Sequence, residues 1–186
     1  MTNPRFIVAA KSSTPRFTVN TATVGLAFGI IGALIETSID QARFHGHMGA
    51  RDPAIFIRAT LVAALAKRFS LEVLDVGPTA KVADDGDGQP DGPPKAPDLV
   101  LEITTNEWGL ASAPTGGAGV AYEGTLRLRD MRTKKVLAEA VCSSRPVTGE
   151  SVGELAANNG AGLRDVVRGV AEFCADDYRH RVLGLY

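Results

Sequence analysis

The sequence has few of the residues on which several protein classes depend. Only two of its 186 residues are cysteines and three are histidines, so a disulfide-dense scaffold and a multi-cysteine zinc site are both excluded. Basic and acidic residues number 20 and 21, and without a basic excess a general nucleic-acid binder is not expected. The longest apolar run, Val24 to Ile35, has twelve residues, whereas a membrane-spanning helix needs about 20. These absences leave a globular domain without an evident catalytic motif.

The composition that remains is that of an ordinary folded domain. Apolar residues make up 45% of the chain and charged residues 22%, which excludes an intrinsically disordered chain. We expect residues 1–186 to form a single domain, because two full domains would be cramped at this length. Within it, residues 77–97 are rich in Gly, Pro and Asp and have no apolar period. They predict an exposed acidic loop.

The first half of the chain predicts two short strands, two helices and a third strand. Residues 5–10 and 17–23 have strand character, and 71–76 follow as another strand. Residues 24–44 have a helical stripe that includes Phe28 and Ile31, with glycines on its neighbouring side. We expect another backbone to approach this helix closely, and a homo-oligomer could supply it. A second helix is predicted from Asp52-Pro53, an N-cap followed by Pro at the first helical position.

The second half predicts a three-stranded meander and a long helix. Residues 98–108, 120–129 and 136–142 have the alternation of strands, with a hairpin turn at 130–134. The C-terminal helix has a capping box at Ser151 and Glu154, an interruption around 158–162, and an apolar stripe from Leu163 to Val182. The fold class predicted is α+β: a two-layer sandwich whose mostly antiparallel sheet has four to five strands. Two N-terminal helices and the long C-terminal helix pack on one face.

The two cysteines are placed on elements that should face each other. Cys142 ends a predicted strand, and Cys174 lies on the inward stripe of the last helix. We favour a disulfide between them, which would indicate an oxidising compartment and contribute about 3–4 kcal/mol by the chain-entropy estimate. Two buried free thiols are the alternative, since free cysteine is a common core residue.

Charge is distributed unevenly along the chain. Residues 84–107 carry seven acids against one lysine, whereas the hairpin at 127–135 has a local charge of +4. Its basic residues are Arg127, Arg129, Arg132, Lys134 and Lys135. Such a hairpin could meet anionic lipid headgroups or glycans, or its charges could protect a sheet edge against aggregation.

No motif in the sequence supports a catalytic, metal or cofactor site. His45-Gly-His47 has no diagnostic spacing, and a solvated helix end is the better interpretation. The acidic run from Asp84 resembles a calcium loop only superficially, because Ala96 stands where an EF-hand requires its bidentate Glu. The glycines match neither a dinucleotide fingerprint nor a phosphate loop. We therefore expect no catalytic residues, no metal and no cofactor.

Several segments together resemble the small, mostly uncharacterised cell-envelope lipoproteins of Gram-negative bacteria. The resemblance is carried by residues 98–110, the strand around Tyr122, residues 136–142 and 171–175, and the glycine-rich helix ahead of a second helix. The layout is similar to periplasmic α/β modules found in outer-membrane assembly and secretion accessories. The resemblance implies a non-enzymatic protein that binds other envelope components. It also implies a periplasmic or outer-membrane-tethered location, with a signal segment not visible within these residues.

Three hypotheses about function follow. The first is an envelope accessory or binding domain without catalysis, which contacts envelope proteins or the membrane surface, with Phe28, Ile31 and the basic hairpin as its candidate surface. The second is a small-molecule-binding protein or hydrolase with a pocket between the first helix and the sheet, near Trp108 and Tyr122. The third is a cytosolic regulatory domain, which would require both thiols to be free.

Overall fold

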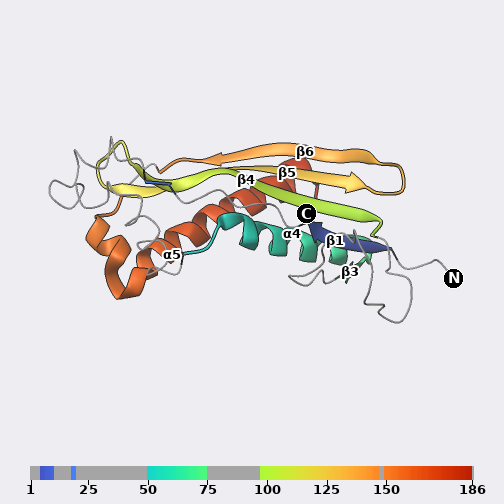
Figure 1. Ribbon diagram of the computed structural model, residues 1–186, viewed down its shortest axis with the longest axis horizontal. Helices are drawn as coiled ribbons and strands as arrows, with labels where there is room; N and C mark the ends of the chain where they lie inside the picture. Colours follow the sequence, from blue (N-terminus) through green and yellow to red (C-terminus); the bar gives the residue numbers. More distant parts are fainter. Residues whose placement is uncertain (1–4, 11–17, 20–49, 75–96, 147–148, 186) are drawn as a thin grey trace, which may run out of the picture.

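A computed structural model describes residues 5–10, 18–19, 50–74, 97–146 and 149–185 of the chain (Figure 1). It has an α+β architecture, with a curved sheet on one side and two helices on the other. The strands are β1 (Phe6–Ala10), β2 (Thr18–Val19), β3 (Glu72–Leu74), β4 (Leu99–Ser112), β5 (Ala118–Asp130) and β6 (Lys135–Ser144). The helices are α4 (Pro53–Phe69) and α5 (Val152–Asp177), and α5 continues into a π-helical turn, η1 (Tyr178–Val182).

The sheet is mixed, which corrects the prediction of a mostly antiparallel sheet. Its strand order is β3-β1-β4-β5-β6, with the short β2 paired to β4 beside this path. Strand β1 runs parallel to both of its neighbours, and β2 also runs parallel to β4. The antiparallel prediction rests on the C-terminal strands and their hairpin turn at 130–134. Between β1 and β3, however, the chain passes through α4, and such a crossover connects parallel strands. The antiparallel part is the meander β4-β5-β6.

The meander strands extend beyond the predicted segments. Strand β4 reaches Ser112 and β5 begins at Ala118, so the connection between them is shorter than expected. A bulge between Thr105 and Glu107 shifts the register and returns Trp108 to the helix-facing side. A second irregularity leaves Leu137 as an extra residue, because Leu128 pairs with Ala138 and Arg129 pairs with Val136.

Helix α4 begins where the sequence predicts. Asp52 is its N-cap and accepts a hydrogen bond from the Ala54 amide at 2.9 Å, and Pro53 occupies the first helical position. Ser70 ends the helix in the left-handed conformation. Ile57, Leu61 and Leu65 recur on one side and are all buried against the sheet. The helix predicted over 24–44 and nearly all of the loop predicted over 77–97 lie outside the described residues.

Helix α5 has the predicted capping box and a sharp interruption. Ser151 and Glu154 exchange hydrogen bonds at its start. Residues 157–160 have non-helical backbone angles, and three of them, Asn158, Asn159 and Gly160, have positive φ. Asn and Gly adopt this conformation more readily than other residues, which explains why the chain turns here. Beyond the kink, the helix runs below the sheet beside α4 (Figure 1).

The core lies between the sheet and the two helices. It contains helix-facing side chains of β4 and β5, together with the buried stripes of α4 and α5. The largest fully buried side chains include Trp108, Tyr122 and Tyr178. In the antiparallel part, the opposite face of the sheet carries polar and charged side chains such as Glu102, Thr104 and Arg127, so one face of the meander is solvated.

Candidate functional site

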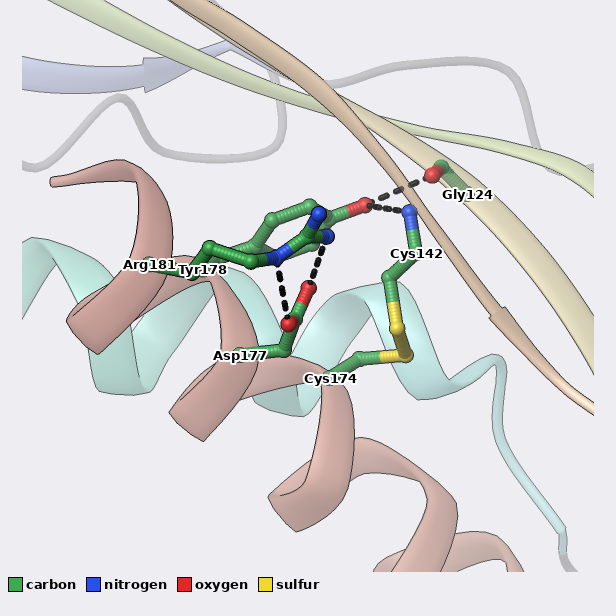
Figure 2. A network of polar contacts seen from close by, with 6 residues as sticks. All are labelled: Gly124, Cys142, Cys174, Asp177, Tyr178 and Arg181. Carbon is green, nitrogen blue, oxygen red and sulfur yellow. Dashed lines mark hydrogen bonds and ion pairs between the residues drawn. A yellow bond between two sulfur atoms is a disulfide. The ribbon is translucent and has the colours of Figure 1, made fainter.

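A disulfide and a tyrosine tie the end of α5 to the sheet. Cys142 of β6 is bonded to Cys174 of α5, with Cα atoms 5.8 Å apart, so the predicted disulfide is present. One turn further along, the Tyr178 hydroxyl donates a hydrogen bond to the Gly124 carbonyl at 2.6 Å and accepts one from the Cys142 amide at 3.0 Å (Figure 2). Burial raises the pKa of Tyr178 to about 12. Gly124 of β5 and Cys142 of β6 pair with each other across the two strands. Because the Tyr178 hydroxyl bonds to both residues, it fixes the end of the helix against β5 and β6.

Asp52 and Thr105 form a second buried polar contact, between α4 and the sheet. The Thr105 hydroxyl lies 2.7 and 2.8 Å from the two Asp52 carboxylate oxygens and donates to the carboxylate. Asp52 and Thr105 are only 5% and 4% exposed. Since Asp52 also caps α4, one carboxylate sets both the start of the helix and its attachment to the bulged part of β4. These bonds account for the burial of this acid.

Trp108 and Tyr122, the residues predicted to lie near a pocket, pair across β4 and β5. Their side chains are 1% and 2% exposed and belong to the core. Burial raises the pKa of the Tyr122 hydroxyl above its ordinary value. Neither side chain is among the lining residues of the three cavities described below. The helix that would form the other wall of the predicted pocket lies outside those residues.

The basic residues of the β5–β6 hairpin divide into two groups. Arg127 forms an ion pair with Glu139 at 2.6 Å, which raises the pKa of the arginine and lowers that of the glutamate. Arg129 lies 3.6 Å from Glu102. The charges of these two arginines are thus balanced by acids on neighbouring strands. The predicted interaction surface is therefore not uniformly basic along the strands.

The second group lies in the turn, where the charges stand among exposed apolar side chains. Arg132, Lys134 and Lys135 are all exposed. Asp130 organises this turn by accepting hydrogen bonds from the Thr133 and Arg132 amides, and these bonds lower its pKa. Three apolar side chains in and beside the turn are also exposed: Met131 by 43%, Val136 by 49% and Leu137 by 54%. The hairpin end is therefore both cationic and apolar.

Strand β6 is an open edge of the sheet that the described residues form. It is the last strand in the order, and most of its residues are exposed. Val141, further along the same strand, is 50% exposed. Natural proteins usually shorten, charge or cover such edges, because an open edge can pair with another chain. The sequence pattern alone does not reveal this exposure, because Val136, Leu137 and Val141 have the composition of a buried strand.

Two adjoining cavities lie between α4 and α5. The first, of about 200 Å³, is lined by Arg51, Phe56, Arg164, Val167 and Arg168. The second, of about 350 Å³, shares Phe56 and Arg168 with the first. Its remaining lining residues are Thr60, Ala171, Glu172, Ala175 and Asp176. This groove was not predicted from the sequence, although the i, i+4 spacing of Arg164 and Arg168 and the off-stripe position of Phe56 are visible there.

A third cavity, of about 230 Å³, lies on the solvated face of the sheet. It is lined by Glu102, Thr104, Asn106, Thr125 and Arg127. Asn106 donates hydrogen bonds to Glu123 at 3.2 Å and to Thr125 at 3.0 Å. Its polar groups are thus largely bonded to one another across the strands, as in a solvated sheet face.

In the part of the chain that the structure describes, no three His, Cys, Asp or Glu side chains gather in a group that could hold a metal ion. His45, His47, Phe28 and Ile31 lie outside that part. No helix among the described residues combines the length and the apolar character that crossing a membrane requires.

Comparison with known proteins gives distant structural similarity. No family model matches the sequence, and no curated protein matches it. Among solved structures, the chain is similar to a dodecamer of a PelC variant from Paraburkholderia phytofirmans, at 15% identity and a TM-score of 0.33, over 92% of this chain and 83% of that one. It is also similar to the lipoprotein GNA1162 from Neisseria meningitidis, at 18% identity and a TM-score of 0.29, over 93% and 99% of the two chains.

Proposed function

We propose that this protein is a non-enzymatic binding domain of a bacterial cell envelope that attaches to an anionic membrane surface through the end of its β5–β6 hairpin. The observation that carries the proposal is the exposure of Met131, Val136 and Leu137 beside Arg132 and Lys134. Apolar side chains of this kind enter the headgroup region of a bilayer, and neighbouring basic side chains are attracted to anionic lipids.

The disulfide supports placement in an oxidising compartment. Disulfides persist in the periplasm and in other extracytoplasmic spaces and are rare in the cytosol. The bond between Cys142 and Cys174 is enclosed, since both residues are at most 3% exposed. An assay for free thiols on protein purified without reductant and then unfolded tests this placement. We expect no reactive thiol, and two reactive thiols would favour the cytosolic hypothesis.

The membrane proposal is tested by sedimentation with lipid vesicles. We expect the protein to bind vesicles that contain phosphatidylglycerol more tightly than vesicles of phosphatidylcholine alone. Each basic residue near the surface contributes about 1 kcal/mol, so replacing Lys134 and Lys135 with Gln should weaken binding by roughly 30-fold. Leu137→Ser should also weaken it, because the apolar contact is lost.

A matched variant controls for general charge attraction. Lys67→Gln with Arg68→Gln removes the same number of charges from the last turn of α4, which lies in the helix layer at the same end of the molecule as the hairpin, so it tests whether binding depends on the hairpin itself. We expect this variant to bind like the unmodified protein. Equal losses in the two double variants, or no preference for phosphatidylglycerol, would refute attachment through the hairpin.

A partner protein that adds a strand to β6 is the second candidate. It is favoured by the exposed Val141, which lies on the same open edge but away from the hairpin turn. The two candidates differ in their response to substitution. Val141→Lys should prevent strand addition and leave vesicle binding unchanged.

A further inference from the structure

The groove between α4 and α5 has the charge pattern of an anion site. Three guanidinium groups, from Arg51, Arg164 and Arg168, surround the first cavity, and no carboxylate among the described residues lines it. Within the same part of the chain, Arg51 and Arg168 form no ion pair. Arg164 is held at the kink of α5, because it donates a hydrogen bond to the Asn159 carbonyl at 2.5 Å. Arginine binds carboxylate and phosphate groups through paired N–H donors, so a cluster of three favours an anionic ligand.

Two helix starts add to the positive potential at this end of the groove. Arg51 lies two residues before the first residue of α4. Arg164 lies in the first turn after the kink at residues 157–160, where the second segment of α5 begins. Each helix N-terminus carries a partial positive charge. The helix ends reinforce the arginines, and neither helix start alone would define a site.

The remainder of the groove is apolar along its length and acidic at its far end. The Phe56 side chain is 44% exposed, although it lies between the two helices, and it lines both cavities. Ala171 and Ala175 continue the apolar wall. Glu172 and Asp176 then line the second cavity. From Arg164 to Asp176, α5 rises by about 18 Å, which is long enough for an anionic head with an extended chain.

We propose that this groove binds a small organic anion with a single charged end. A carboxylate or phosphate monoester lies among Arg51, Arg164 and Arg168, and an aliphatic or aromatic body extends over Phe56 toward Ala175. Glu172 and Asp176 disfavour a second negative charge at the other end of the ligand, because like charges repel across a short distance.

Isothermal titration with octyl phosphate, inorganic phosphate and octanol tests both halves of the site. We expect octyl phosphate to bind tightest, because only it has both the charge and the chain. Arg168→Gln should lower the affinity for octyl phosphate by about tenfold, since it removes charge-assisted hydrogen bonds. Phe56→Ala should lower the affinity for octyl phosphate and leave the affinity for inorganic phosphate unchanged. Equal affinity of octyl phosphate for the unmodified protein and both variants would overturn the proposal.

Two further ligand pairs test the far end of the groove and the source of the anion. Decanoate should bind more tightly than decanedioate, and Glu172→Gln with Asp176→Asn should remove that difference. A preference for decanedioate in the unmodified protein would contradict the assigned polarity. If dihexanoyl phosphatidic acid binds more tightly than octyl phosphate, the anion comes from a membrane lipid. If octyl phosphate binds more tightly, the ligand is a free single-chain anion. In either case, Arg168→Gln should lower the affinity for the ligand that binds more tightly.

Discussion

Reduction of the Cys142–Cys174 disulfide should lower stability by an amount that the length of the closed loop determines. The two cysteines are separated by 32 positions. Closing a loop of that length removes about 12 cal/mol/K of entropy from the unfolded chain, which corresponds to about 3.7 kcal/mol at 25 °C. With a urea dependence of about 2 kcal/mol/M, the unfolding midpoint should fall by roughly 2 M.

The reduced protein should remain folded at zero urea, because a second attachment joins the same elements. Tyr178 still bonds Gly124 and the Cys142 amide after the sulfur bridge is opened. Urea unfolding followed by circular dichroism, with and without a phosphine reductant, measures the difference. A variant with both cysteines replaced by Ala is the control, since the reductant should leave its midpoint unchanged. A fall of less than about 1 kcal/mol on reduction of the unmodified protein would refute the loop-entropy argument.

Two other predictions concern the buried polar groups. The pKa of Tyr178 is raised to about 12 in the fold, against an ordinary value of about 10. The contribution of this tyrosine to the free energy of unfolding is therefore fully present below pH 10 and is lost as the pH rises from 10 toward 12. The urea midpoint should therefore fall between about pH 10 and pH 12, and an equal fall in Tyr178→Phe would exclude this tyrosine as a cause. Asp52→Ala should cost about 2–4 kcal/mol, because it removes the cap of α4 and leaves the buried Thr105 hydroxyl without its acceptor. Asp52→Asn keeps one acceptor oxygen, so it should lower the free energy of unfolding less than Asp52→Ala when both variants are unfolded in urea. Equal losses of stability would show that Asp52 does not act both as the cap of α4 and as the acceptor for Thr105.

Local patterns in the sequence were enough to predict most individual elements. Alternation predicted the three meander strands, and the capping signals at Asp52 and Ser151 predicted where two helices begin. The paired asparagines before Gly160 predicted the interruption of α5. In each case the signal depends on neighbouring residues and on the steric preferences of single side chains. The local sequence is therefore sufficient to predict these elements.

The pairing between distant strands could not be predicted in the same way. Strand β1 has only five residues, and nothing in its composition indicates that it lies between β3 and β4 or that it runs parallel to both. The same limit applies to the groove, which exists because α4 and α5 come together from opposite halves of the chain. Arg51 and Arg168 are ordinary surface residues until that packing brings them to one cavity. The disulfide was predictable because the chain has only two cysteines to pair.

The inner position of β1 has a consequence for the order in which the chain can assemble. The meander β4-β5-β6 is contiguous in sequence, so its pairings close short loops and can form early. In contrast, Ile7 of β1 pairs with Val73 on one side and with Leu99 on the other. During synthesis, β1 must therefore wait until β4 has emerged before its second edge is covered. Until then it is a short apolar segment with an open side, which makes it a natural target for a chaperone.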